Sequence, residues 1–160
     1  MIHVDLIVLG KLKEPYLRQA AAEYEKRLQA FCRLQTIELM PYRLPDDPSD
    51  AQIADALEKE AAEIEKHLAA NAVVYALCIE GKTVSSEQFS AQLSKAAVEG
   101  TGTIAFVIGS SFGLSERIKR RAHLRISMSP MTFPHQLARV MLLEQLYRAF
   151  QIRAGGKYHK

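Results

Sequence analysis

Short apolar runs alternate with segments of helical periodicity along the whole chain. The apolar runs are Ile2–Leu9, Leu34–Leu39, Ala72–Ile79, Thr103–Ile108 and Leu124–Met128. A continuous run such as Ala72–Ile79 is typical of a central parallel strand, because such a strand is buried on both faces. Strands that alternate with helices predict an α/β fold with a mainly parallel sheet flanked by helices.

Five helices are expected between and after these strands. They are predicted from Pro15 to about Gln29, from Ser49 or Asp50 to about Ala70, from Ser85 or Ser86 to near Gly100, from Ser115 to Arg121, and from Pro134 to about Arg153. The pair Gly81-Lys82 is predicted to turn the chain after the third strand. The length of 160 residues fits a single domain over 1–160.

Composition argues against a membrane or secreted protein. No apolar run approaches the roughly 20 residues of a membrane helix, and Met1–Leu9 lacks the basic start of a signal peptide. The two cysteines, Cys32 and Cys78, lie in apolar segments without metal-ligand spacing. We therefore expect free thiols, no metal site and a cytoplasmic location.

Charge is distributed unevenly along the chain. Residues 117–160 hold ten Lys/Arg and one acid, Glu144, for a net charge of +9, whereas residues 1–116 carry −6. This asymmetry predicts a surface in the C-terminal part that faces a polyanion. A solvated basic face without a partner is the alternative.

Two loops lie at the ends of two predicted strands and are candidate ligand-binding segments. Gly109–Gly113 follows Thr103–Ile108, and the loop through Phe133 follows Leu124–Met128. In parallel sheets, ligands bind at the carboxyl ends of the strands. The glycine loop is neither GxGxxG nor a Walker A motif. Taken alone, either loop is also explained as an ordinary connection.

Further candidates lie in the C-terminal part. His135 and Arg139 are four residues apart and share a helix face. The terminal Tyr158-His159-Lys160 joins an aromatic ring to basic groups, which suits stacking on bases and contact with phosphate; a disordered tail is the alternative. These features indicate a ligand-binding α/β domain with a basic face, and they do not name a reaction. A non-catalytic RNA- or ribosome-binding protein and a nucleotide-binding regulatory domain both stay open, although the latter lacks a Lys-Ser/Thr pair after its glycines.

Several motifs occur together in one order. They are Leu6–Lys13, Glu23–Leu28, Leu77–Lys82, Phe106–Gly109 with Gly113–Ser115, Met131–Gln136, Glu144–Phe150 and Tyr158–Lys160. With them the chain resembles the ribosomal RNA large subunit methyltransferase H (RlmH) family over its whole length. One position departs from the family, which usually carries Gly-Gly where this chain has Gly109-Ser110.

The resemblance implies a SPOUT-class methyltransferase with a C-terminal trefoil knot, working as a homodimer. It implies methylation of N3 of a pseudouridine in 23S ribosomal RNA, on the assembled ribosome, with S-adenosylmethionine as methyl donor. The cofactor-binding residues it implies are Leu77, Gly109, Met128, Ser129, Pro130, Met131, Thr132 and Phe133. The candidates for catalysis, by orientation or charge stabilisation, are His135, Arg139, Arg148, Tyr158 and His159. Contact with RNA is then expected from basic residues that include Lys119, Arg120 and Arg121.

Overall fold

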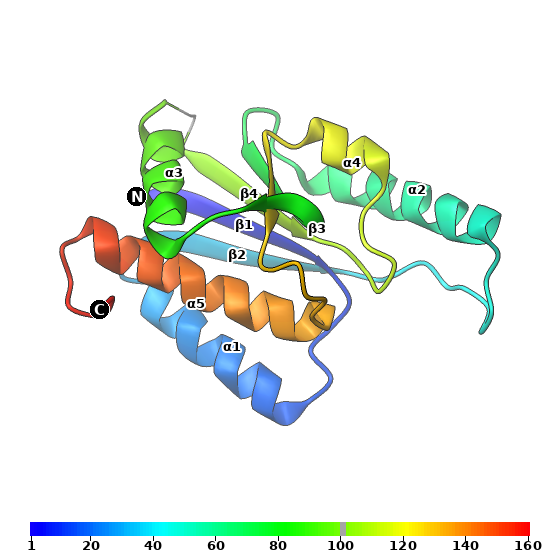
Figure 1. Ribbon diagram of the computed structural model, residues 1–160, viewed down its shortest axis with the longest axis horizontal. Coiled ribbons are helices and arrows are strands. Elements are labelled where there is room, and N and C mark those ends of the chain that lie inside the picture. The colour runs from blue at the N-terminus through cyan, green and yellow to red at the C-terminus, as the bar shows by residue number, and fades with distance from the viewer. Residues whose placement is uncertain (100–101) are drawn as a thin grey trace.

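The computed structural model describes residues 1–99 and 102–160, in which strands and helices alternate (Figure 1). The elements are β1 (Ile2–Leu9), α1 (Pro15–Leu28), β2 (Cys32–Leu39), α2 (Asp50–His67), β3 (Val73–Thr83), α3 (Ser86–Glu99), β4 (Thr103–Ile108), α4 (Glu116–Arg121), β5 (Leu124–Ser127) and α5 (His135–Arg153). The strands form one sheet in the order β2-β1-β4-β3-β5, and each pairing is parallel. The predicted α/β class with a parallel sheet is confirmed.

Helices cover both faces of the sheet. Helices α1, α3 and α5 lie on one face, and α2 and α4 lie on the other (Figure 1). Along β4, Phe106 packs into the first core while Val107 packs into the second. Successive residues of a strand point to opposite faces. The unbroken apolar runs in the sequence therefore reflect a sheet that is buried on both sides.

Strand β3 differs most from expectation. It pairs with β4 and β5 on its two sides, but β4 holds the middle position of the sheet. The predicted turn at Gly81-Lys82 is wrong, because β3 continues to Thr83 with a shift in its register against β5 between Leu77 and Lys82. A Cβ on Gly81 would lie 2.7 Å from the carbonyl carbon of Ile126. Glycine is needed there for close approach to β5.

Other boundaries shift by one to three residues, the largest shift being the end of α2 at His67 in place of about Ala70. Strand β2 begins at Cys32, and β5 ends at Ser127. Ser49 caps α2 through a capping box with Gln52, as the sequence suggested. The predicted end of the third helix near Gly100 falls outside the described residues.

The sequence predicted no membrane-spanning helix, and the family resemblance implied a trefoil knot. Among the described residues, no helix has the length and apolar character needed to span a bilayer. The trefoil knot stays a prediction, because strand order and pairing do not test it.

Replacing Gly81 by Ala should destabilise the protein by about 2–3 kcal/mol, because the added methyl group meets backbone atoms of β5 that no rotamer change can move. Urea unfolding measures the effect. The exposed neighbour Lys82 provides the control, since Lys82→Ala should stay within about 0.5 kcal/mol of the parent. A Gly81→Ala protein as stable as the parent would contradict the close approach.

Candidate functional site

A groove of about 810 Å³ lies at the carboxyl ends of β3, β4 and β5. We call it the strand-end groove; its walls come from the end of β3, the loop after β4, and the loop between β5 and α5. Of the residues singled out from the sequence, those that line it are Leu77, Gly109, Met128, Ser129, Met131, Thr132, Phe133 and His135. Pro130 is not part of the lining. Two loops far apart in sequence thus close around one concave site.

The glycine loop takes its shape from an internal contact. A Cβ on Gly109 would lie 2.2 Å from the carbonyl oxygen of Gly113, and the Gly113 amide donates to the Ser110 carbonyl at 2.9 Å. Within the described chain, positive φ angles occur only at Gly10, Gly102, Gly113 and Gly155. Gly109 is therefore required for tight packing inside the loop, without a left-handed backbone.

Ser110 connects this loop to helix α2. Its hydroxyl donates to Oε1 of Glu60 at 3.0 Å, and Oε2 of Glu60 accepts the Tyr42 amide at 2.9 Å. Glu60 is 6% exposed, so both oxygens of a buried carboxylate have partners. Since Ser110 has no positive φ, serine fits where the family usually has glycine, and it adds an anchor to α2.

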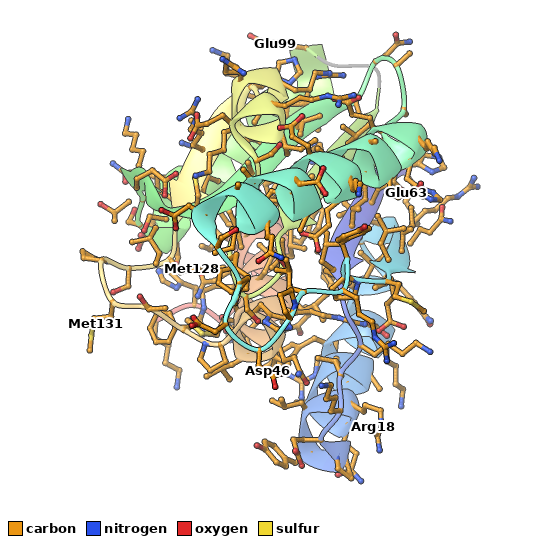
Figure 2. All side chains as sticks on the ribbon, turned by 90° about the vertical axis from the view of Figure 1, so that its right-hand side faces the viewer. Arg18, Asp46, Glu63, Glu99, Met128 and Met131 are labelled. Carbon is orange, nitrogen blue, oxygen red and sulfur yellow. The ribbon has the colours of Figure 1, made fainter. Side chains whose placement is uncertain are left out.

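The loop after β5 is held by short-range hydrogen bonds. The Ser127 hydroxyl donates to the Ser129 carbonyl at 2.9 Å, and the Ser129 hydroxyl accepts the Met131 amide at 3.0 Å. Figure 2 shows Met131 at the tip of the loop, away from the body of the protein, while Met128 lies closer in. The loop therefore offers an apolar wall at Met128 and an exposed apolar rim at Met131.

The structure separates His135 from Arg139. His135 lines the strand-end groove, and its pKa is lowered by burial and by the nearby Lys13, so the imidazole is neutral at neutral pH. Arg139 is buried and donates to Glu38 of β2 at 2.7 Å. Helical spacing placed both on one side of α5, but only His135 faces the groove.

The C-terminal tail is fixed against α5 through Glu144. Oε1 of this carboxylate accepts from Arg148 Nε at 3.0 Å and from the Tyr158 hydroxyl at 3.1 Å. His159 lies between Arg148, at 3.2 Å, and Glu87 of α3, at 2.7 Å. Burial raises the pKa of Tyr158 to about 12, helped by its hydrogen bonds to Tyr24 and Glu144. The phenol therefore stays protonated and acts as a donor, and the tail is ordered by specific contacts.

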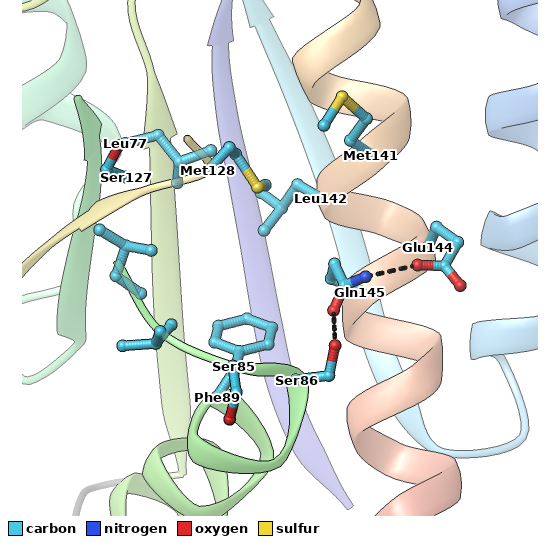
Figure 3. A pocket seen from close by; sticks show the side chains of 12 residues that line it. Leu77, Ser85, Ser86, Phe89, Ser127, Met128, Met141, Leu142, Glu144 and Gln145 are labelled. Carbon is cyan, nitrogen blue, oxygen red and sulfur yellow. Dashed lines mark hydrogen bonds between the residues drawn. The ribbon is translucent and has the colours of Figure 1, made fainter. Parts of the chain in front are cut away.

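A second cavity of about 400 Å³ lies between α3 and α5 (Figure 3). We call it the α3–α5 cavity. Four of its lining residues also line the strand-end groove, and these form a shared wall: Leu77, Ile126, Ser127 and Met128. Its opposite side includes Ser86, Glu144 and Gln145. Sequence reasoning missed this cavity, because it exists only where two helices about fifty residues apart in the chain pack together.

The C-terminal tail and Arg148, which Glu144 holds together, therefore border the α3–α5 cavity. Glu144 lines the cavity and holds Arg148 and Tyr158, and Glu87 follows the lining residue Ser86 directly in α3. Of the five candidate catalytic residues, the structure brings together Arg148, Tyr158 and His159 outside the cavity, next to its lining residue Glu144. His135 is in the groove, and Arg139 is in neither site.

Some basic residues of the C-terminal part already have carboxylate partners within the protein. Lys119 pairs with Glu80 and Glu116, and its side chain is only 15% exposed at the wall of the groove. Its neighbours Arg120 and Arg121 make no ion pair with any residue that the structure describes, and contact of all three residues with RNA stays a prediction. The described residues also hold no group of three or more potential metal ligands.

Arg139→Ala should lower the free energy of unfolding by about 2 kcal/mol, because it leaves Glu38 without its partner in a partly buried ion pair. Urea unfolding measures this loss, and Glu38→Gln should also destabilise the protein because it leaves the more deeply buried Arg139 guanidinium without its carboxylate partner. Unchanged stability of the Arg139→Ala protein would mean that the residue is free for another role.

Comparisons with known proteins agree with this geometry. Residues 2–159 match the family model described as "Predicted SPOUT methyltransferase". A protein of Streptococcus equi subsp. zooepidemicus named "Ribosomal RNA large subunit methyltransferase H" is 52% identical over 98% of this chain and 99% of its own length. A protein of the same name from Leuconostoc mesenteroides subsp. mesenteroides is 45% identical over 99% of this chain and 100% of its own.

Two solved structures share the fold at low sequence identity. A probable methyltransferase from Bordetella pertussis Tohama I has a TM-score of 0.56 at 15% identity, covering 92% of this chain and 93% of that one. A probable methylase family protein from Haemophilus influenzae Rd KW20 has a TM-score of 0.53 at 16% identity, covering 99% of this chain and 70% of that one. From its family model and its full-length relatives, the chain belongs to the SPOUT methyltransferases and, among them, to the ribosomal RNA large subunit methyltransferase H family.

Proposed function

We propose that this protein transfers a methyl group from S-adenosylmethionine to N3 of a pseudouridine in large-subunit (23S) ribosomal RNA, acting on the assembled ribosome in the cytoplasm. The observation that carries the proposal is the strand-end groove, which two loops close in a chain about half identical to named ribosomal RNA methyltransferases. A concave site at the carboxyl ends of parallel strands is where an α/β protein binds a small ligand.

The groove suits a nucleoside cofactor. Its volume of about 810 Å³ lies within the range of small-molecule sites. Leu77 and Phe133 offer apolar surface to an adenine ring, while backbone groups of the Met128–Phe133 loop offer donors and acceptors to its edge. The tight loop at Gly109 lets backbone approach the rest of the ligand closely.

The chain positions groups around the reacting atoms. When bound, S-adenosylmethionine supplies an electrophilic methyl group, whose transfer to N3 breaks the carbon–sulfur bond, leaves the electron pair on sulfur and releases the N3 proton. Leu77 and Met128 exclude water from the wall between groove and cavity. Arg148, Tyr158 and His159 orient the RNA at the cavity side, which lowers the barrier through alignment.

The RNA surface is proposed to include Arg120, Arg121 and Arg153, for which no ion pair is found in the described part of the chain. Free guanidinium groups bind phosphate oxygens and release counterions.

A second subunit is proposed to complete this surface, because a single domain of this size is small for a ribosomal target. Sedimentation at micromolar concentration should then give a homodimer, and a monomer would contradict that assembly.

The function is tested by mass mapping of 23S ribosomal RNA from cells with and without the gene. We expect one pseudouridine to lose the mass of a methyl group when the gene is absent and to regain it on complementation. Identical maps in both strains would refute the proposed reaction. Calorimetry with S-adenosylmethionine separates the alternative, a non-catalytic RNA-binding protein, which would not bind the cofactor.

Gly109→Ala should weaken S-adenosylmethionine binding more than tenfold in a calorimetric titration, because the methyl group displaces the Gly113 backbone and deforms the loop. Gly102→Ala near the other end of β4 is the control for a loss of stability outside the groove, because its positive φ strains the backbone while the added Cβ meets nothing within 4 Å. It should bind the cofactor like the parent. Equal affinity of the Gly109→Ala protein would remove this loop from the cofactor site.

A further inference from the structure

We propose that the α3–α5 cavity receives the target base, and that the amide of Gln145 reads the edge that distinguishes pseudouridine from uridine. This inference rests on the proposed function and goes beyond it by assigning a place and a reader to the base. Methyltransferases that act on a stacked base extrude it into a pocket, where it is held by hydrogen bonds and by apolar or aromatic side chains.

The cavity has the size and walls for a nucleobase. Its volume of about 400 Å³ exceeds what one pyrimidine ring needs and leaves room for part of the ribose. Phe89, Met141 and Leu142 give it apolar walls. Ser86 and Gln145 bring polar groups to one side, where Figure 3 shows them joined by a hydrogen bond.

The cavity also lies in the right place. One side is the shared wall of Leu77 and Met128, beside which the cavity adjoins the groove proposed for the methyl donor. The other side is Glu144, around which Arg148 and Tyr158 gather. Groove and cavity adjoin where they share these lining residues. A base in this cavity would lie next to the donor, with its N3 in direct contact with the methyl group as an in-line transfer requires, while its backbone meets the basic tail.

The orientation of the Gln145 amide follows from its neighbours. Nε2 donates to Oε2 of Glu144 at 2.8 Å, and an ionised carboxylate can only accept. Oε1 must then face Ser86, whose hydroxyl donates to it at 2.7 Å. Each amide atom retains unused capacity, namely one N–H and one oxygen lone pair. The free pair matches a ligand that carries a donor next to an acceptor.

Pseudouridine carries such a pair at N1 and C2, whereas uridine offers a donor beside an acceptor only at N3, the atom to be methylated. The ribose of pseudouridine is attached to C5, so N1 keeps a hydrogen beside the C2 carbonyl, whereas N1 of uridine carries the ribose. Gln145 can accept from N1–H and donate to O2, and N3 then lies on the adjoining edge, toward Leu77 and Met128. Arg148 and Tyr158 act indirectly here, because they fix Glu144, which in turn fixes the amide.

Methionine methyl resonances report directly on occupancy. In a protein with labelled methionine methyl groups, added pseudouridine nucleoside should shift Met141 and Met128, and leave Met1 and Met40 unchanged as internal controls. Uridine should shift the Met141 and Met128 resonances less. In the Gln145→Leu protein, pseudouridine and uridine should shift these resonances equally. Shifts at Met128 and Met131 without Met141 would place the nucleoside in the strand-end groove and overturn the proposal.

Methylation of ribosomes tests the specificity. The substrates are ribosomes that carry either pseudouridine or uridine at the target position. Gln145→Leu should reduce the methylation rate on pseudouridine about tenfold, as expected for a lost hydrogen bond. It should also lower the ratio of the rate on pseudouridine to the rate on uridine. Affinity for S-adenosylmethionine should not change. Ser86→Leu, which fills the cavity, should also slow methylation, whereas Ser94→Leu adds the same side chain to α3 outside the cavity and should not.

The outcomes separate the two proposals. If the parent protein methylates ribosomes but Gln145→Leu keeps both its rate and its preference, the cavity assignment fails and the proposed function stands. If the parent protein does not methylate ribosomes, the proposed function fails, and a nucleoside-induced shift of Met141 would still reveal a base-binding cavity.

Discussion

The carboxylate of Glu144 connects the C-terminal tail, helix α5 and the α3–α5 cavity. One oxygen accepts from Arg148 and Tyr158, and the other accepts from Gln145. Its side chain is 18% exposed, so these bonds form with little competition from water. The high pKa of Tyr158 follows from burial and from the same contacts. Without this single acid of the basic C-terminal part, the donors around it would have no common acceptor.

Close backbone approach sets the geometry of the other half of the site. Gly81 allows the end of β3 to lie against β5, and Gly109 allows the loop after β4 to fold onto Gly113. Both glycines avoid clashes with backbone atoms; Gly109 lines the groove, and Gly81 directly follows the lining residue Glu80. The buried Glu60 then anchors the glycine loop through Ser110. A rigid edge of the sheet thereby holds two loops in fixed positions, as precise placement of a ligand requires.

Strand and helix placement could be predicted from the sequence because the sheet is buried on both faces, which leaves unbroken apolar runs. The two loops of the strand-end groove were also predictable, since ligands bind at the carboxyl ends of parallel strands. The individual cofactor-binding residues were implied by the family resemblance. Gly81 was misinterpreted because a glycine needed for close approach looks like a turn glycine in sequence. Arg139 was grouped with His135 because helical spacing does not reveal that Glu38 of β2 lies beside it. The role of Gln145 depends on the packing of α3 against α5, which periodicity does not specify.

The central claim is that methyl donor and target base make direct contact where the strand-end groove and the α3–α5 cavity adjoin, beside the shared wall of Leu77 and Met128. A crystal structure of the protein with S-adenosylmethionine tests it most directly. The account predicts that the ligand fills the strand-end groove with its sulfonium beside Leu77 and Met128, and that the α3–α5 cavity stays free for the base. Density for the cofactor inside the α3–α5 cavity, or with its methyl group turned away from that wall, would contradict the account.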